Sequence, residues 1–259
     1  MPVHFLFPSH PLHASVIDDA FADQRAAAEA LGFTTSLCSD DVLDARKPLR
    51  NVPAGGTVVY WGWMMTGPQY ERLSAAVVAA GAVPLTSPAQ YLSAHHLPNW
   101  YPRIADLTPE TVVLDVDADL EAELRRLAWD AFFVKDYVKS LKTSVGSVVR
   151  DPATIGTVVA EMRRFRGDIE GGLCVRRLEP FVEGTERRYF VVRVKPYAAN
   201  DDPVPDIVRA AAGRIAGPFF SIDVAQRVDG VPRVVEIGDG QVSDLVGWTP
   251  RRFYEVWRG

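Results

Sequence analysis

The chain has 259 residues, of which 47% are hydrophobic and 24% charged, as is typical of a soluble globular protein with one large or two modest domains. Its 33 acidic and 28 basic side chains give a net charge of −5, which does not favour a general nucleic-acid-binding surface, although a local basic groove is compatible with it. No apolar run reaches the length of a membrane span, and the N-terminus lacks the pattern of a secretion signal, so we expect a cytoplasmic protein without a membrane partner.

The first part of the chain alternates strands with helices. Apolar runs predict strands at 3–9, 33–38 and 55–64. Apolar residues at helical spacing predict helices over 17–31 and 68–81. This alternation predicts a parallel α/β domain over residues 1–105. Cys38 and Cys174 lie in apolar strand-like runs, which favours two buried thiols in a reducing compartment over a disulfide.

After a proline-rich stretch, long strands dominate. Helices are expected at 118–130, 152–167 and 205–217. Strands are expected at 132–134, 173–182, 187–195, 218–228 and 232–238. Strands of this length with few helices between them predict largely antiparallel sheet in an α+β domain over residues 106–259.

The stretch FFVKDYVKSLKTSVGSVV, residues 132–149, places three lysines directly after an apolar strand. Lys135, Lys139 and Lys142 precede a Ser/Thr/Gly loop that ends at Gly146. A nucleotide's phosphates need cations and free backbone N–H groups, which a strand lysine and a flexible loop can supply. Taken alone, lysines at strand ends are more often a solvated edge.

Two further stretches carry carboxylates. Glu179 and Glu186 stand seven residues apart around Gly184, a pattern that by itself is typical of a β-hairpin with a charged turn. Asp223 and Glu236 are embedded in apolar strands on either side of an expected turn at Asp229-Gly230, which would bring them opposite each other. Two facing carboxylates in apolar strands need a cation, and Mg²⁺ prefers such oxygen ligands.

Taken in order, these stretches resemble the ATP-grasp superfamily over roughly 110–259, and most closely its compact clade associated with RNA ligases. The resemblance implies an α/β N-terminal domain (1–105) followed by an α+β ATP-grasp domain (106–259). The two lobes of the latter (106–178 and 179–259) would have largely antiparallel sheets and hold ATP between them.

The resemblance also implies roles for individual residues. Lys135 would hold phosphates, and Lys139 or Lys142 would lie on the mobile loop near the terminal phosphates. Glu179, Phe181 and Val182 would contact adenine, and Glu186 the ribose. Arg188 and Lys195 would point into the phosphate and substrate region, as catalytic residues. Asp223 and Glu236 would bind Mg²⁺.

This sequence departs from the family pattern at two places. Gly238 stands where the family usually has Asn, so either Asp239 supplies the third metal ligand or one metal site is weakened. The segment 91–109 lacks the usual upstream lysine, so either His96 or Arg103 substitutes for it or the phosphate grip is looser. By itself the pair His95-His96 is more often a surface pair than a ligand set.

The resemblance predicts an ATP- and Mg²⁺-dependent ligase that joins a small-molecule or peptide carboxylate to an amine through an acyl-phosphate. The alternative is an ATP-binding protein that acts on or with RNA or a protein partner without ligase turnover, and Gly238 favours that alternative. The acceptor carboxylate, the nucleophile and the oligomeric state do not follow from the sequence.

Overall fold

The computed structural model describes residues 2–138, 140, 146–167 and 169–258. It divides into two compact units. Unit 1 contains Met1–Ala94, Arg187–Asp223 and Ile237–Gly259, and unit 2 contains His95–Glu186 and Val224–Glu236. Compactness thus groups the N-terminal residues with part of the C-terminal sheet, whereas the domain boundaries given above stay a prediction.

The N-terminal part of unit 1 is the expected parallel α/β arrangement. Its strands are β1 (Val3–His10), β3 (Thr34–Cys38), β4 (Thr57–Tyr60) and β5 (Val83–Pro84). β1 pairs in parallel with β3 and β4, and β4 with β5, while β2 (His13–Ile17) folds back antiparallel on β1. The helices are α1 (Ala22–Ala30), α2 (Asp40–Leu43), α3 (Gly67–Ala79) and α4 (Pro88–His95). β4 ends at Tyr60, earlier than expected, because a side chain at Gly62 would collide with Tyr60 and Pro8.

A second sheet has the strand order β11-β10-β12-β13. Its strands are β10 (Arg187–Val192), β11 (Lys195–Tyr197), β12 (Phe219–Gln226) and β13 (Pro232–Asp239), with helices α8 (Asp206–Ala212) and α9 (Pro250–Glu255). The single strand expected at 187–195 is therefore a hairpin, whose turn residues Arg193 and Val194 have positive φ angles of 50° and 68°. Phe190 and Phe219 of this sheet pack with Phe5 and Trp61 in one core cluster, which explains why they share unit 1.

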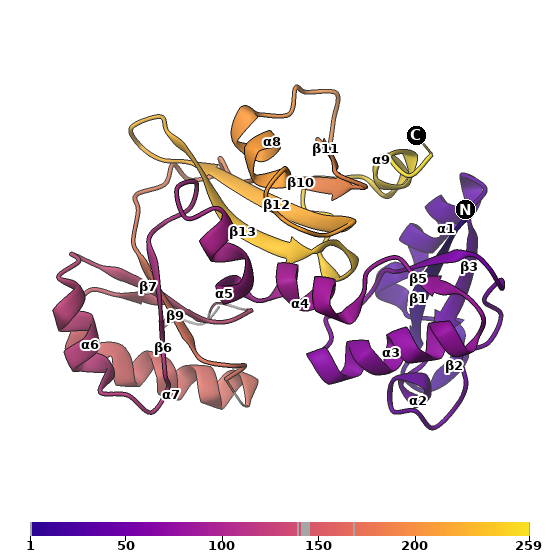
Figure 1. Cartoon of the computed structure of the whole chain (residues 1–259), viewed down its shortest axis with the longest axis horizontal. Helices are drawn as coiled ribbons and strands as arrows, with labels where there is room; N and C mark the ends of the chain where they lie inside the picture. The colour runs from indigo at the N-terminus through magenta and orange to yellow at the C-terminus, as the bar shows by residue number, and fades with distance from the viewer. Residues whose placement is uncertain (1, 139, 141–145, 168, 259) are drawn as a thin grey trace. The chain divides into compact units, whose positions relative to one another are not determined.

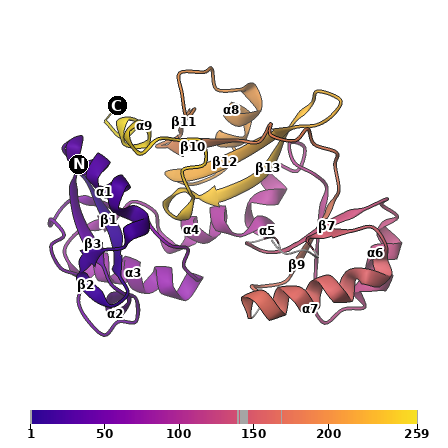
Figure 2. The same ribbon diagram turned by 180° about the vertical axis from the view of Figure 1, so that it is seen from behind.

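Unit 2 contains an antiparallel sheet in the order β6-β9-β7-β8. The strands are β6 (Thr111–Leu114), β7 (Phe132–Asp136), β8 (Val148–Val149) and β9 (Leu173–Arg177). Helices α6 (Leu120–Leu127) and α7 (Ile155–Arg166) cover one face, seen in Figure 1 and from behind in Figure 2. Leu124 and Met162 of these helices pack against Phe132 and Val134. β9 ends five residues before the expected end at 182, and Pro180, which has no N–H to donate, lies in the part that is not strand.

Shorter elements complete the chain. The helix α5 spans Leu97–Trp100, and 3₁₀ turns cover Asp19–Phe21, Tyr101–Arg103, Pro152–Thr154 and Gly240–Val242. Cys38 and Cys174 are both buried free thiols, as expected, and one lies in each unit. Within the described ranges, the helices are all too short or too polar to cross a bilayer.

Candidate functional site

Lys135 is buried and paired with Glu236. Along β7, Phe132 and Val134 enter the core beneath α6 and α7, so the alternation of the strand turns Lys135 to the other face. Lys135 is only 5% exposed, and its Nζ donates to Oε1 of Glu236 at 2.9 Å. Burying an ammonium is costly unless a carboxylate compensates it, so each of these groups stabilises the charge of the other.

Arg176 lies on the same face of this sheet as Lys135, and sequence reasoning missed it. The register pairs Lys135 with Cys174 and Phe133 with Arg176, which places the guanidinium one pair further along. It donates to the carbonyl oxygen of Val235 and to Oγ1 of Thr108, both at 2.6 Å. Burial lowers the pKa of Arg176 to about 10. Because it holds the residue next to Glu236, Arg176 fixes this part of β13. An arginine in an apolar strand was its only signal.

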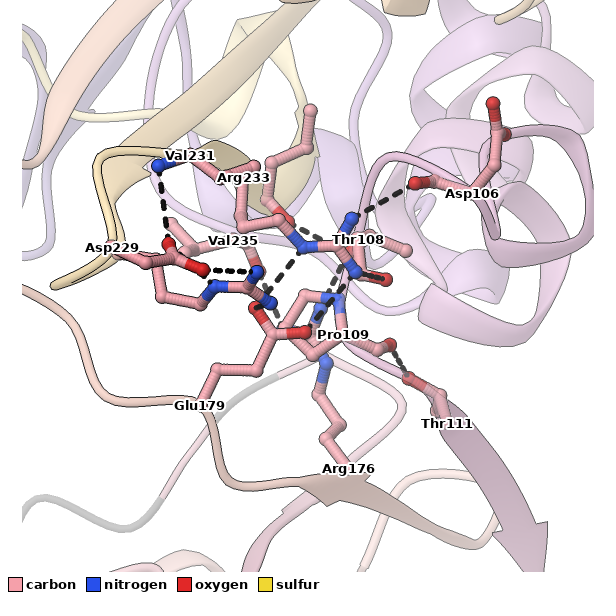
Figure 3. Close-up of polar contacts among 12 residues, drawn as sticks. Asp106, Thr108, Pro109, Thr111, Arg176, Glu179, Asp229, Val231, Arg233 and Val235 are labelled. Carbon is pink, nitrogen blue, oxygen red and sulfur yellow. Dashed lines mark hydrogen bonds and ion pairs between the residues drawn. The ribbon is translucent and has the colours of Figure 1, made fainter.

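Glu179 is held by Arg233 (Figure 3). Nε and Nη2 of Arg233 donate to the two carboxylate oxygens at 3.0 and 3.1 Å. The same guanidinium donates to the backbone oxygens of Asp106 and Thr108. A bidentate arginine is a strong and directional partner, so it fixes both the position and the charge of Glu179.

The backbone after Glu179 pairs with residues 226–228. The N–H of Val182 donates to Gln226 and the N–H of Val228 donates to Pro180, on either side of an antiparallel bridge between Phe181 and Arg227. The carbonyl of Val182 accepts from Thr185. In this bonding pattern the N–H and C=O of Phe181 point away from the paired segment. The exposed edge of this segment is therefore formed by Phe181 and not by Val182.

In unit 1, Arg188 and Asp223 form a second buried ion pair. Nε and Nη2 of Arg188 donate to the two oxygens of Asp223 at 2.8 and 2.6 Å. Nη1 of Arg188 also donates to the carbonyl of Asp244. Asp223 is 2% exposed. Asp223 and Glu236 thus each have a cation of their own, which answers the need for compensation that the sequence raised. They fall in different units, so their opposition stays a prediction.

Ser221, Gly238 and Ser243 meet beside this pair. Oγ of Ser221 lies 2.8 Å from Oγ of Ser243, which donates to the carbonyl of Asp239 at 2.8 Å. A Cβ added at Gly238 would lie 3.1 Å from both hydroxyl oxygens. Ser221 lies two residues from Asp223 on β12, so both side chains leave the same face. The space next to Gly238 is therefore filled by two hydroxyls.

Asp239 is fully buried and faces away from the predicted metal ligands. It stands three residues after Glu236 in β13, so the two side chains leave opposite faces. Its Oδ1 accepts from the backbone and side-chain nitrogens of Gln241, each at 3.0 Å, and Gln241 also donates to Tyr70. Burial raises the pKa of Asp239 to about 7. This position gives no support to the expectation that Asp239 is the third metal ligand.

The other predicted residues lie apart from these pairs. Lys195 follows the β10–β11 turn, where its Nζ lies 4.9 Å from the ring centroid of Tyr197. Val192, its partner, is four residues from Arg188, about 13 Å along a strand, so the structure does not bring Lys195 to Arg188. Glu186 is exposed just before β10. Lys139 and Lys142 lie outside the described residues.

His96 was one candidate for the missing upstream lysine. Its Nε2 lies 2.9 Å from Oε1 of Glu170, and its ring packs edge-on against Tyr137. Tyr137 is two residues after Lys135 and rests on Gly171, where a Cβ would collide with its ring. Arg103, the other candidate, ends the 3₁₀ turn Tyr101–Arg103 and is exposed. His96 is therefore the candidate whose side chain is tied to the lysine stretch.

Neither of the two largest cavities contains the two ion pairs. The largest, about 480 Å³, is lined by Arg25, Lys47 and Arg50 together with hydroxyls of β2 and β3. The second, about 300 Å³, lies in unit 2 and reaches Glu179 beside Arg150 and Arg177. Among the residues that the structure describes, no three His, Cys, Asp or Glu side chains are grouped as a metal site. Any metal at these carboxylates would therefore need further oxygens.

Comparison with known proteins gives a family and a fold. A family model of the ATP-grasp domain, the third family within one of its clades, matches residues 100–256. Among solved structures, D-cycloserine synthetase DcsG has a TM-score of 0.65 at 15% identity, with 98% of each chain covered. No curated protein matches the sequence.

Two further structures are similar over most of the chain. The macrocyclase MdnC, bound with precursor peptide MdnA from Microcystis aeruginosa MRC, has a TM-score of 0.62 at 13% identity, with 99% of each chain covered. The D-alanine–D-alanine ligase from Bacillus anthracis, complexed with ATP, has a TM-score of 0.60 at 13% identity. It covers 93% of this chain and 86% of its own. At these identities the likeness shows a shared fold.

Proposed function

We propose that this chain, which belongs to the ATP-grasp family whose model it matches, is an ATP- and Mg²⁺-dependent ligase that joins a carboxylate to an amine. The observation that carries the proposal is the buried pair Lys135–Glu236, because it places a phosphate-binding cation and a metal-binding carboxylate on each other at the strand where the family pattern predicts them.

The residues fit Mg²⁺ and the phosphates of ATP. Mg²⁺ prefers carboxylate oxygens, and it would neutralise the charge that develops between the transferred and the leaving phosphates. A carboxylate offers about four lone-pair sites, and Arg188 uses two of those on Asp223, so a metal need not displace the arginine. Lys135 would exchange Glu236 for a phosphate, and Glu236 would exchange Lys135 for the metal.

The proposed reaction has two steps. A carboxylate oxygen of the substrate attacks the γ-phosphorus of ATP, and the bond to the bridging oxygen breaks, which yields an acyl-phosphate and ADP. The amine nitrogen then attacks the acyl carbon, phosphate leaves with the C–O electron pair, and the nitrogen loses a proton. Lys135 and Arg188 position and neutralise the phosphoryl group, and no side chain of this protein forms a covalent bond.

For base recognition we favour the backbone of Phe181. Its N–H and C=O point away from residues 226–228, where they can meet the acceptor N1 and the amino group of adenine. Both backbone groups of Val182 are hydrogen bonded within the protein. The carboxylate of Glu179, held by Arg233, keeps two lone-pair sites for an amino group. Adenine would thus be read at Phe181, next to the position that the family resemblance favoured.

The substrate class that we propose is a small-molecule or peptide carboxylate. The similar structures include a D-alanine–D-alanine ligase and a macrocyclase bound with its precursor peptide, which act on substrates of these two kinds. The alternative is nucleotide binding without ligation, with RNA or a protein as the partner. Gly238 favours this alternative, because it removes a side-chain oxygen from the strand that carries Glu236.

The test is ADP release from Mg-ATP with a panel of amino acids and acidic peptides, with hydroxylamine added as a small nucleophile. An acyl-phosphate converts hydroxylamine to a hydroxamate, which is detected directly. Lys135→Ala should abolish both signals, whereas Lys47→Ala, at an exposed lysine paired with Asp41, should keep them. Binding of Mg-ATP without ADP release for any carboxylate would favour the alternative over the ligase.

A further inference from the structure

Within unit 1, the two hydroxyls beside Gly238 have an unambiguous proton order. The carbonyl of Asp239 can only accept, so the single proton of Ser243 Oγ is used there, at 2.8 Å. The contact of 2.8 Å between the two hydroxyls must then be a donation from Ser221 to Ser243. The other acceptor near Ser221, the carbonyl of Gly238, is 3.5 Å away and too distant to compete.

This order leaves Ser221 Oγ with two lone pairs and no proton to donate. An oxygen in that condition is a ligand for a cation, and Ser221 is held in this orientation by a buried strand and by Ser243. Ser221 also shares a face of β12 with Asp223, about 6.6 Å away along the strand. The longer side chain of aspartate can shorten that span to the separation of two neighbouring ligands on one Mg²⁺ ion.

We infer that Ser221 Oγ, together with Asp223, binds the Mg²⁺ ion that accompanies ATP. This inference rests on the proposed function and identifies the oxygen that a glycine at position 238 cannot supply. A side chain at 238 would enter the space of Ser221 and Ser243, so an oxygen from β12 replaces one from β13. Asp239, on the opposite face, is not needed as a ligand.

The metal would bind only with the nucleotide. Arg188 already neutralises Asp223, and the two hydroxyls carry no charge, so these groups offer a free cation little attraction. The phosphates of a bound nucleotide add the missing negative charge. Measurements of metal affinity must therefore be made with the nucleotide present.

The test measures the affinity of Mn²⁺, a paramagnetic substitute for Mg²⁺, in the presence of ADP, by the loss of the free-ion resonance signal. Ser221→Ala should weaken Mn²⁺ binding at least about tenfold and leave metal-free ADP binding unchanged. Ser36→Ala, which removes a buried hydroxyl bonded to His4 in the same unit, is the matched control and should bind Mn²⁺ like wild type.

A rescue variant separates ligation from a structural effect. In Ser221→Ala, the space around position 238 opens, so adding Gly238→Asn should return an oxygen from the opposite strand and restore Mn²⁺ affinity. Equal Mn²⁺ affinity in wild type and Ser221→Ala, both folded by their melting temperatures, would overturn the inference and leave the proposed function intact. If wild type shows no metal-dependent ADP binding, the proposed function fails and the inference fails with it.

Discussion

Nζ of Lys135 and Oε1 of Glu236 lie 2.9 Å apart, so a cation proposed to hold phosphate and a carboxylate proposed to hold metal are partners of each other. A phosphate that takes Lys135 leaves Glu236 without this cation, and a metal that takes Glu236 leaves the buried Lys135 without this anion. Only the two together replace both contacts. This exchange couples the binding of metal and nucleotide.

We therefore expect Mg-ATP to stabilise the protein and Mg²⁺ alone to leave its melting temperature unchanged. At a ligand concentration a hundredfold above the dissociation constant, linkage gives about 2.7 kcal/mol. The measurement is thermal unfolding with Mg²⁺, with ATP plus a chelator, and with both. Equal shifts for Mg-ATP and chelated ATP would contradict the coupling.

Lys135→Ala should weaken Mg-ATP binding by about 1.5–3 kcal/mol, because a charge-assisted phosphate contact is lost. Calorimetric titration with a non-hydrolysable ATP analogue measures it. Lys47→Ala removes a lysine at the same cost in charge but at an exposed site, and should bind like wild type. If both variants bind alike, Lys135 has only a structural role on β7.

Glu236→Gln should abolish turnover and also destabilise the protein without ligands, since Lys135 loses its charged partner while staying buried. A fully buried pair broken in this way costs about 3–5 kcal/mol, and we expect roughly half of that because the side chain of Glu236 is 42% exposed. Urea unfolding measures the loss. A variant as stable as wild type would show that the ion pair contributes nothing, contrary to the structure.

Asp239 predicts a pH dependence of stability. Its pKa is raised from 3.8 to about 7 by burial, so the folded protein holds a proton that the unfolded chain releases. The stabilising contribution is complete below about pH 4 and is lost as the pH rises to 7, by about 1.4 kcal/mol per unit between these values.

Urea unfolding at pH 5 and pH 7 should thus show a loss of about 2–3 kcal/mol from this group, and Asp239→Asn should remove that part of the slope. Asp117→Asn, at an exposed side chain, is the control that should keep it. The same slope in Asp239→Asn and wild type would assign the dependence to other groups.

The sequence predicted the family, the fold class and the burial of both cysteines, because these depend on local patterns of apolar residues and on the order of motifs. The family match over residues 100–256 confirms the resemblance. The face of β7 that carries Lys135 also follows from alternation alone. Lys195 was placed wrongly in one long strand, because Arg193 and Val194 have neither the glycine nor the asparagine that usually marks a turn of positive φ.

The partners of the site residues could not be predicted. Arg188 meets Asp223 from 35 residues away, and Lys135 meets Glu236 from 101 residues away, so neither pair has a local signal. The position of Asp239 was within reach, since a strand turns residues 236 and 239 to opposite faces. The role of Ser221 depends on the hydroxyl contact to Ser243, which only the folded chain forms.

The two cysteines make the protein its own reporter of local opening. Burial raises the pKa of both thiols to about 12, so neither forms the thiolate that reacts with an alkylating reagent while its surroundings stay closed. Cys38 lies in unit 1 and Cys174 in unit 2. Alkylation followed by peptide mass analysis therefore times the opening of each unit separately in the unmodified sequence. Addition of Mg-ATP would show which of the two rates the nucleotide slows.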